Sequence, residues 1–279
     1  MKRIADDVVL LFLLVGVTVG TPAMALEFPG NSDLTLSDAD QVVTVEADSN
    51  GTKRYTLHTE LFDRKLQAVA VYAKEYPPKF SDAIERERTI EVVQFLSTVV
   101  ENLKEAFESD AALARRAGLL YTMAFNLDLQ EAFVSDAPPS LETTRAAHYY
   151  NIALQRAPDD AETHWTFGVF LSSIHSAASR EKAVSHLERA VELGSIPALY
   201  SLALVYATSD GEQRQRAIEL MERYVAQAPD DETASKLLKA VKEGRIRPVS
   251  GHFDREGKPV QGGGSYPGGH SQEKEEAVR

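Results

Sequence analysis

The sequence predicts an all-α fold of stacked helix pairs, preceded by a short β-hairpin and followed by a disordered C-terminal tail. Apolar residues recur at three- and four-residue spacing through most of the chain after Glu60, which is the period of an α-helix. The segment that begins at Ala183 is similar to the one that begins at Ala217, 34 residues later, which is the period of a helical repeat. Proline pairs and Pro-Asp-Asp turns divide this part of the chain into helices of ordinary length.

The composition fits a folded protein and excludes several classes of site. The 279 residues are 43% hydrophobic, so the chain can bury a core. The net charge is −12, which argues against a nucleic-acid partner and against charge-driven binding to an anionic membrane. The chain has no cysteine, so disulfides, thiolate-ligated zinc, iron–sulfur clusters and cysteine nucleophiles are all excluded.

The N-terminus has the layout of a secretory signal peptide. Lys2 and Arg3 form a basic end, an apolar run begins at Val8, and Ala23-Met24-Ala25 supplies the small residues of a cleavage site. We expect residues 1–25 to be removed from an exported bacterial protein that is periplasmic or secreted and is not in a membrane after cleavage. An uncleaved anchor is the alternative, because the uncharged run from Val8 is just long enough to span a bilayer.

Residues 26–59 predict an extended segment with a short β-hairpin. Three β-branched residues follow Val42, Asn50-Gly51 favours a tight turn, and Arg54-Tyr55-Thr56-Leu57 can form the returning strand. A lone hairpin is only marginally stable in water. We therefore expect this one either to pack on another element or to fluctuate.

Residues 60–133 predict a helical region that is partly repeat-like. Its first helix ends at Pro77-Pro78, because proline disrupts a helix interior. Asp82 is placed to cap the second helix, whose apolar stripe runs from Ile84 to Phe107. A third helix is expected over Asp110–Phe133.

Residues 134–244 contain the repeat, beginning with a helix expected from Ser140 to Arg156. The spacing of Ala146, Tyr150, Ala153 and Pro158 recurs at Ala217, Met221, Tyr224 and Pro229. In the intervening helices, Phe167-Gly168 followed by Leu171 aligns with Leu202-Ala203 followed by Tyr206, and Ala117-Gly118 followed by Tyr121 is an earlier candidate copy. Small residues at these positions let two helices approach closely, and such pairs must stack to bury their apolar faces.

On these residues the chain resembles the tetratricopeptide repeat family. The resemblance is clearest over residues 161–231 and extends to 110–160 if an insertion is allowed near Ser135–Ser140. The related Sel1-like repeats fit the same spacing and stay open as an alternative. The resemblance implies a right-handed α-solenoid in which residues 232–244 are the terminal capping helix and the first helix of each pair lines a concave groove.

The resemblance also implies which side chains face a partner. The candidate partner-binding residues are Arg115, Leu119, Trp165, Val169, Tyr200 and Leu204, and Thr122 and Met123 fall on the same predicted face. Such a groove is aromatic and apolar, which suits a helix or an extended peptide with large apolar side chains. Trp165 either contacts a partner or packs between helices, because a shift of one residue in the register would turn it inward.

Residues 245–279 predict a disordered tail. This segment holds Gly262-Gly263-Gly264, Gly268-Gly269 and few large apolar residues. It cannot bury enough surface to offset the entropy lost on ordering.

No catalytic, phosphate-binding or dinucleotide-binding motif occurs in the chain, and no two histidines share the spacing that would place them side by side on one helix. We therefore expect no enzyme activity, cofactor or metal, and a role as an adaptor that binds a protein or peptide in envelope assembly, transport or secretion. Two alternatives stay open. One is an enzyme or enzyme subunit with an unrecognised site in residues 26–133. The other is a self-associating protein, a homo-oligomer, that pairs through an exposed apolar face on Ile84–Phe107.

Overall fold

The computed structural model describes residues 34, 36, 38–47, 49, 53–74, 78–128, 141–174, 176–207 and 211–245. The predicted signal peptide (1–25) lies outside these residues, as does the predicted tail after residue 245. The described part is mostly helical with one two-stranded antiparallel sheet, which confirms the predicted class. Within it, no helix is long and apolar enough to cross a membrane.

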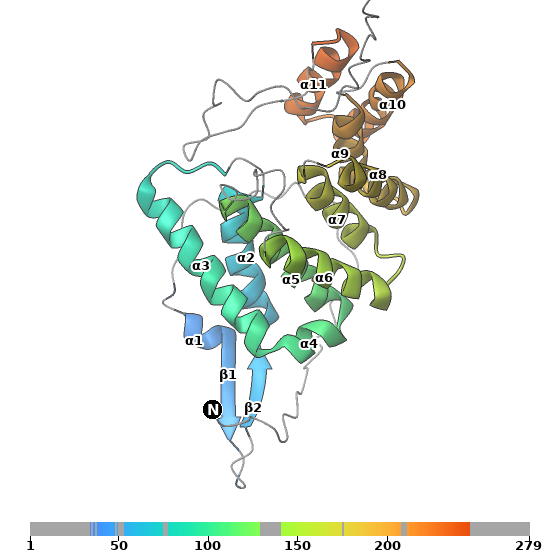
Figure 1. Ribbon diagram of the computed structural model, residues 1–279. Coiled ribbons are helices and arrows are strands. Elements are labelled where there is room, and N and C mark those ends of the chain that lie inside the picture. The colour runs from blue at the N-terminus through green and yellow to red at the C-terminus, as the bar shows by residue number, and fades with distance from the viewer. Residues whose placement is uncertain are drawn as a thin grey trace, which may run out of the picture.

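The elements follow one another from the hairpin at one end of the molecule to the C-terminal helices at the other (Figure 1). In chain order they are α1 (Ala39–Val42), β1 (Val43–Ala47), β2 (Lys53–Leu57), α2 (Thr59–Ala73), α3 (Ala83–Asn102), α4 (Lys104–Ser109), α5 (Ala111–Asp128), α6 (Leu141–Arg156), α7 (Ala161–Ser173), α8 (Ala177–Glu192), α9 (Ile196–Ala207), α10 (Glu212–Gln227) and α11 (Glu232–Lys242).

The predicted β-hairpin is present and is anchored at its base. The register places Val43 opposite Leu57. Val42, directly before β1, is fully buried, and the His58 amide donates to its carbonyl at 2.9 Å. Val45, further along β1, is 52% exposed. The hairpin therefore packs through its base, and its outer part extends away from the helices (Figure 1).

A partly buried ion pair holds Asp38, directly before α1, on α2. Lys65 is 1% exposed, and its Nζ donates to Asp38 Oδ1 at 2.5 Å. This hydrogen bond is the main reason that the pKa of Asp38 lies below its ordinary value. A charge removed from water needs a partner, so the pair fixes Asp38, directly before α1, against α2.

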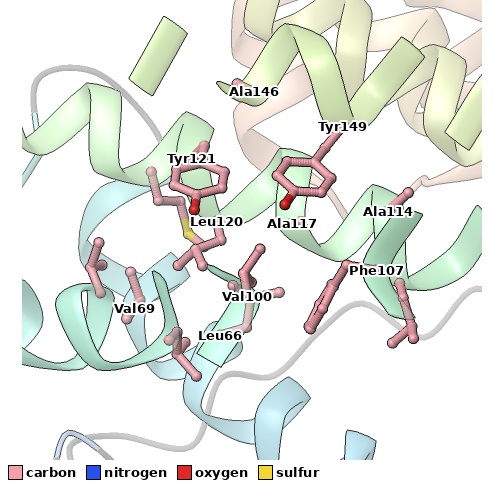
Figure 2. Packing of buried hydrophobic residues seen from close by; sticks show 14 of the residues in the cluster. Leu66, Val69, Val100, Phe107, Ala114, Ala117, Leu120, Tyr121, Ala146 and Tyr149 are labelled. Carbon is pink, nitrogen blue, oxygen red and sulfur yellow. The ribbon is translucent and has the colours of Figure 1, made fainter. Parts of the chain in front are cut away.

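The N-terminal core is formed by α2, α3, α4 and α5. Figure 2 shows Leu66 and Val69 of α2 facing Val100 of α3 and Leu120 of α5. The stripe expected from Ile84 to Phe107 is divided at Leu103, where α3 ends and α4 begins. Most of that stripe is buried here, and of its two ends Phe107 is 0% exposed and Ile84 is 57% exposed. The self-association alternative required an exposed apolar face on residues 84–107. Most of that face is buried in the protein's own core.

The remaining helices pack as consecutive pairs. The closest associations join α5 to α6, α7 to α8 and α9 to α10, and adjacent pairs meet through α6 with α7 and α8 with α9. The helix predicted over Asp110–Phe133 is described as α5 as far as Asp128, and residues 129–140 lie outside the description. The predicted boundary at 133/134 thus falls between the two members of one pair.

Each of the first two pairs has a glycine at its closest approach. A Cβ added to Gly118 of α5 would lie 2.8 Å from the ring of Tyr150, and one added to Gly168 of α7 would lie 2.7 Å from Leu187 Cγ. The third pair has Ala203 and Met221 at the matching positions, and both are fully buried. The predicted rule of a small residue facing a large one is therefore seen between α5 and α6 and between α7 and α8.

Aspartates cap the helices as predicted. Asp82 accepts a hydrogen bond from the Glu85 amide at 2.8 Å, Asp160 from the Thr163 amide at 3.2 Å, and Asp231 from the Ala234 amide at 2.9 Å. Each bond satisfies an amide that the first turn of a helix leaves without an intrahelical acceptor.

Gly168→Ala should lower the free energy of unfolding by about 1–3 kcal/mol, because the new methyl group would overlap Leu187. Helix propensity alone predicts the opposite sign, a gain of about 1 kcal/mol. Urea denaturation followed by circular dichroism measures the difference. In a Leu187→Ala background the penalty should shrink, and an unchanged penalty there would show that the contact with Leu187 is not its cause.

Asp38→Asn should destabilise the protein at neutral pH by about 2–4 kcal/mol, because it removes the carboxylate that faces buried Lys65. The folded pKa of Asp38 is depressed, so its contribution is present above the unfolded value of about 3.9 and is lost as the pH falls below it. Denaturation of wild type and variant at a series of pH values should therefore show the two converging in acid. A constant difference would contradict the role of the charge.

Candidate protein-binding surface

The first helices of the three pairs lie next to one another. α7 contacts both α5 and α9. Between α5 and α7, the Arg115 guanidinium pairs with Glu162 and lies 3.7 Å from Asp160. Between α7 and α9, Trp165 Nε1 donates to Ser201 Oγ at 3.0 Å. We call the side chains along these three helices the α5/α7/α9 surface: Arg115, Leu119, Trp165, Val169, Tyr200 and Leu204.

All six predicted residues are partly exposed. Leu204 is the most open of them, at 37%, and the other five are half-buried. The buried stripe of α7 is a different one, formed by Phe167, Phe170 and Leu171. The six residues therefore lie on a face of the first helices that is partly exposed to solvent.

The prediction that Thr122 and Met123 join this surface is wrong. Thr122 is 6% exposed and Met123 is 0% exposed. The Thr122 hydroxyl donates to the Gly118 carbonyl at 2.9 Å and lies 3.2 Å from the Tyr150 hydroxyl. α5 is covered by α2, α3 and α4 as well as by α6, so a larger part of its circumference is buried than in the other first helices.

Trp165 packs between helices and is also partly exposed. Its ring packs against the core of the C-terminal pairs. Its N–H is satisfied by Ser201, whose hydroxyl in turn donates to the Pro197 carbonyl at 3.2 Å. The preceding residue, His164, faces α8 instead. Trp165 is thus a bridge from α7 to α9 that still presents apolar area at the surface.

Tyr200 extends the aromatic part of the surface along α9. Its ring centroid lies 5.2 Å from that of Tyr224 on α10, at an interplanar angle of 53°. The Tyr224 hydroxyl is held by Asp231 at 3.1 Å. Tilted rings at this separation attract one another, so the contact with Tyr224 of α10 favours one orientation of the Tyr200 ring.

Arg115 does not offer a free positive charge. Burial lowers the pKa of Arg115, and the nearby Asp160 opposes that effect. Glu162 and Asp160 already balance the guanidinium. The surface is therefore best described as apolar and aromatic, with its one cation neutralised inside the protein.

The described residues offer no site for a metal ion, since no group of three or more histidine, aspartate or glutamate side chains is gathered among them. Among the buried polar side chains of the N-terminal region, Thr89 donates to the Glu85 carbonyl one turn earlier, and Asn126 of α5 donates to the Ala73 carbonyl at the end of α2. These contacts stabilise helices, and they give no support to the enzyme alternative.

Two supporting residues were missed from the sequence. Ser201 orients Trp165, and Tyr224 supports Tyr200. Their partners are 36 and 24 residues away in the chain, so helical spacing carries no signal for either contact. Comparisons with protein-family models, with curated proteins and with solved structures find no match to this chain.

Trp165→Phe and Ser201→Ala should each cost about 0.5–1.5 kcal/mol in unfolding free energy, because each removes one partner of the hydrogen bond. The double variant should cost less than the sum, with a coupling of about 0.5–1 kcal/mol. Urea denaturation of the four proteins measures this cycle. Strict additivity would mean that the bond does not join α7 to α9 in solution.

Proposed function

We propose that this chain is an exported bacterial interaction protein of the tetratricopeptide kind, which binds a protein or peptide partner on the α5/α7/α9 surface. In this proposal α5/α6, α7/α8 and α9/α10 are successive repeats of a right-handed α-solenoid, and α11 is the capping helix. The protein acts as an adaptor in envelope assembly, transport or secretion, and it is not an enzyme.

The recurrence of one contact carries the proposal. Gly118 against Tyr150 and Gly168 against Leu187 occupy the same place in two successive pairs. The first helices contact one another through Arg115 with Glu162 and Trp165 with Ser201. Helix pairs that repeat a contact and meet through their first helices stack in one direction, which is how repeat proteins build an extended binding face. Sel1-like pairs would stack by the same logic.

The chemistry of the surface favours an apolar partner segment. Leu119, Val169 and Leu204 share this surface with the rings of Trp165 and Tyr200, and Arg115 is already paired. Aromatic side chains that are rigidly supported make strong anchors at interfaces, because little rotamer entropy is lost on binding. An amphipathic helix or an extended peptide with large apolar side chains matches this face.

Export is supported by the N-terminal sequence. Lys2, Arg3, the apolar run from Val8 and the small residues Ala23 and Ala25 have the order of a cleavable signal. A chain without cysteine suffers no thiol oxidation in the periplasm. We place the adaptor in the periplasm or outside the cell on this basis.

Leu204→Glu should reduce partner affinity at least tenfold, because it places a charge at the most exposed apolar residue of the surface while disturbing little of the core. The mature protein is used to capture a partner from a periplasmic extract, and the purified partner is then titrated by calorimetry. Ile84→Glu, at an apolar residue on α3 that is 57% exposed against 37% for Leu204, is the control for a new surface carboxylate and should bind as wild type does.

Circular dichroism first checks that both variants are folded. A partner that binds Leu204→Glu with full affinity but loses affinity for Ile84→Glu would move the interface to α3 and contradict the proposal. Failure of the mature protein to retain any partner would weaken the adaptor function itself.

A further inference from the structure

Two histidines meet inside the α7/α8 pair. His164 Nδ1 lies 3.0 Å from His186 Nδ1, and His164 Nε2 lies 2.9 Å from the Pro158 carbonyl oxygen. The ring of His186 is also 4.6 Å from the buried ring of Phe167. The pair thereby joins the turn before α7, α7 itself and α8.

The hydrogen bonds determine where the protons are. A carbonyl only accepts, so His164 Nε2 carries a proton and donates to Pro158. Neutral His164 then has a bare Nδ1, which accepts the Nδ1–H of His186. Both rings are neutral in this arrangement, and each hydrogen bond has one donor and one acceptor.

The pair accommodates one added proton but not two. A proton on His164 Nδ1 makes both nitrogens of that ring donors, and His186 must then move its own proton to Nε2 and accept. A second proton places an N–H on each of the two nitrogens that are 3.0 Å apart. Two donors and two positive charges at that distance repel, so the doubly protonated rings have to separate.

The charged groups around the two histidines do little to stabilise a second positive charge on the pair. Lys182, one turn before His186 on α8, is a further positive charge acting on that ring. In the turn before α7, Asp159 is bound by Arg189 at 2.6 Å, and Asp160 bonds to Thr163 and lies near Arg115. α9, which packs on α8, contains no charged residue, and Tyr150 of α6 stacks on Phe167 as a neutral ring.

The position of the pair links it to the binding surface. His164 directly precedes Trp165, and Pro158 lies in the same turn as Asp160, which holds Arg115. Separation of the rings would loosen α7 on α8 and release the turn. Trp165 and Arg115 would then lose the support that orients them on the α5/α7/α9 surface.

We propose that the His164–His186 pair is a proton-operated latch: in acid the rings separate, the α7/α8 pair opens, and the α5/α7/α9 surface loses its binding form. The last part rests on the proposed function of that surface. The opening itself is a property of the protein alone, so it is tested without a partner.

The pH window follows from the titration of His186. Burial, then the charges of His164 and Lys182, lower the pKa of His186 from 6.5 to about 4. In the opened pair the ring returns to its ordinary value, so the open form binds more protons between these two values and opening is favoured as the pH falls. With allowance for partial solvation, opening should become about tenfold more favourable between about pH 7.5 and about pH 5.

The experiment measures amide hydrogen exchange of α7 and α8 in the mature protein at both pH values, after correction for the intrinsic exchange rates. Fluorescence of Trp165, the only tryptophan, is followed in parallel. His186→Gln keeps a donor toward His164 Nδ1 and does not titrate. His148→Gln is the matched control, because His148 pairs with Glu108 at 2.8 Å on the surface, away from this pair.

Wild type and His148→Gln should both show the tenfold increase in opening and a change in Trp165 fluorescence, and His186→Gln should show neither. An increase of the same size in His186→Gln, or no increase in wild type, would overturn the latch. With a purified partner in hand, release at about pH 5 from wild type but not from His186→Gln supports the link to the surface. Equal release from both would place the pH dependence in the partner contacts and overturn that link.

Discussion

The close approach of the two helices in each pair is the constraint on which the rest of the structure depends. At Gly118 and Gly168 the backbone of the first helix lies so near the second that even a methyl group would overlap Tyr150 or Leu187. Protein interiors are packed as densely as organic crystals, and the large side chain opposite the glycine fills the space that a Cβ would occupy. That contact sets which side of the first helix faces its partner and therefore which side is left for the surface.

One helix connects the two halves of the core. Ala183 of α8 belongs to the cluster that reaches back to the N-terminal helices, and Leu187, one turn later, belongs to the cluster formed with α9, α10 and α11. The N-terminal end is fastened differently, through buried Val42 and through the ion pair of Lys65 with Asp38. The hairpin thus does not depend on its own stability, which would be marginal for two strands in water.

α7 brings structure and proposed function together, because its faces serve different neighbours. Phe167 and Phe170 pack in the core, His164 meets His186 of α8, and Trp165 reaches Ser201 of α9. A change at one face of a rigid helix is transmitted to the others through its orientation. This is the physical reason why a titrating pair between α7 and α8 would act on a surface that it does not itself line.

The sequence by itself determined the helical class, the hairpin, the aspartate caps and the small-against-large contacts, because each depends on residues close in the chain or one repeat apart. The six residues that it predicted to face a partner are partly exposed in the structure, whereas Thr122 and Met123 are buried, since the extra helices that cover α5 leave no trace in the periodicity of α5. Only the tertiary structure decided the contacts between distant residues: Lys65 with Asp38, Trp165 with Ser201, and His164 with His186, which are 22 residues apart and on different helices. Helical spacing predicts which residues share a face, and it holds no information about which side chain of another helix that face will meet.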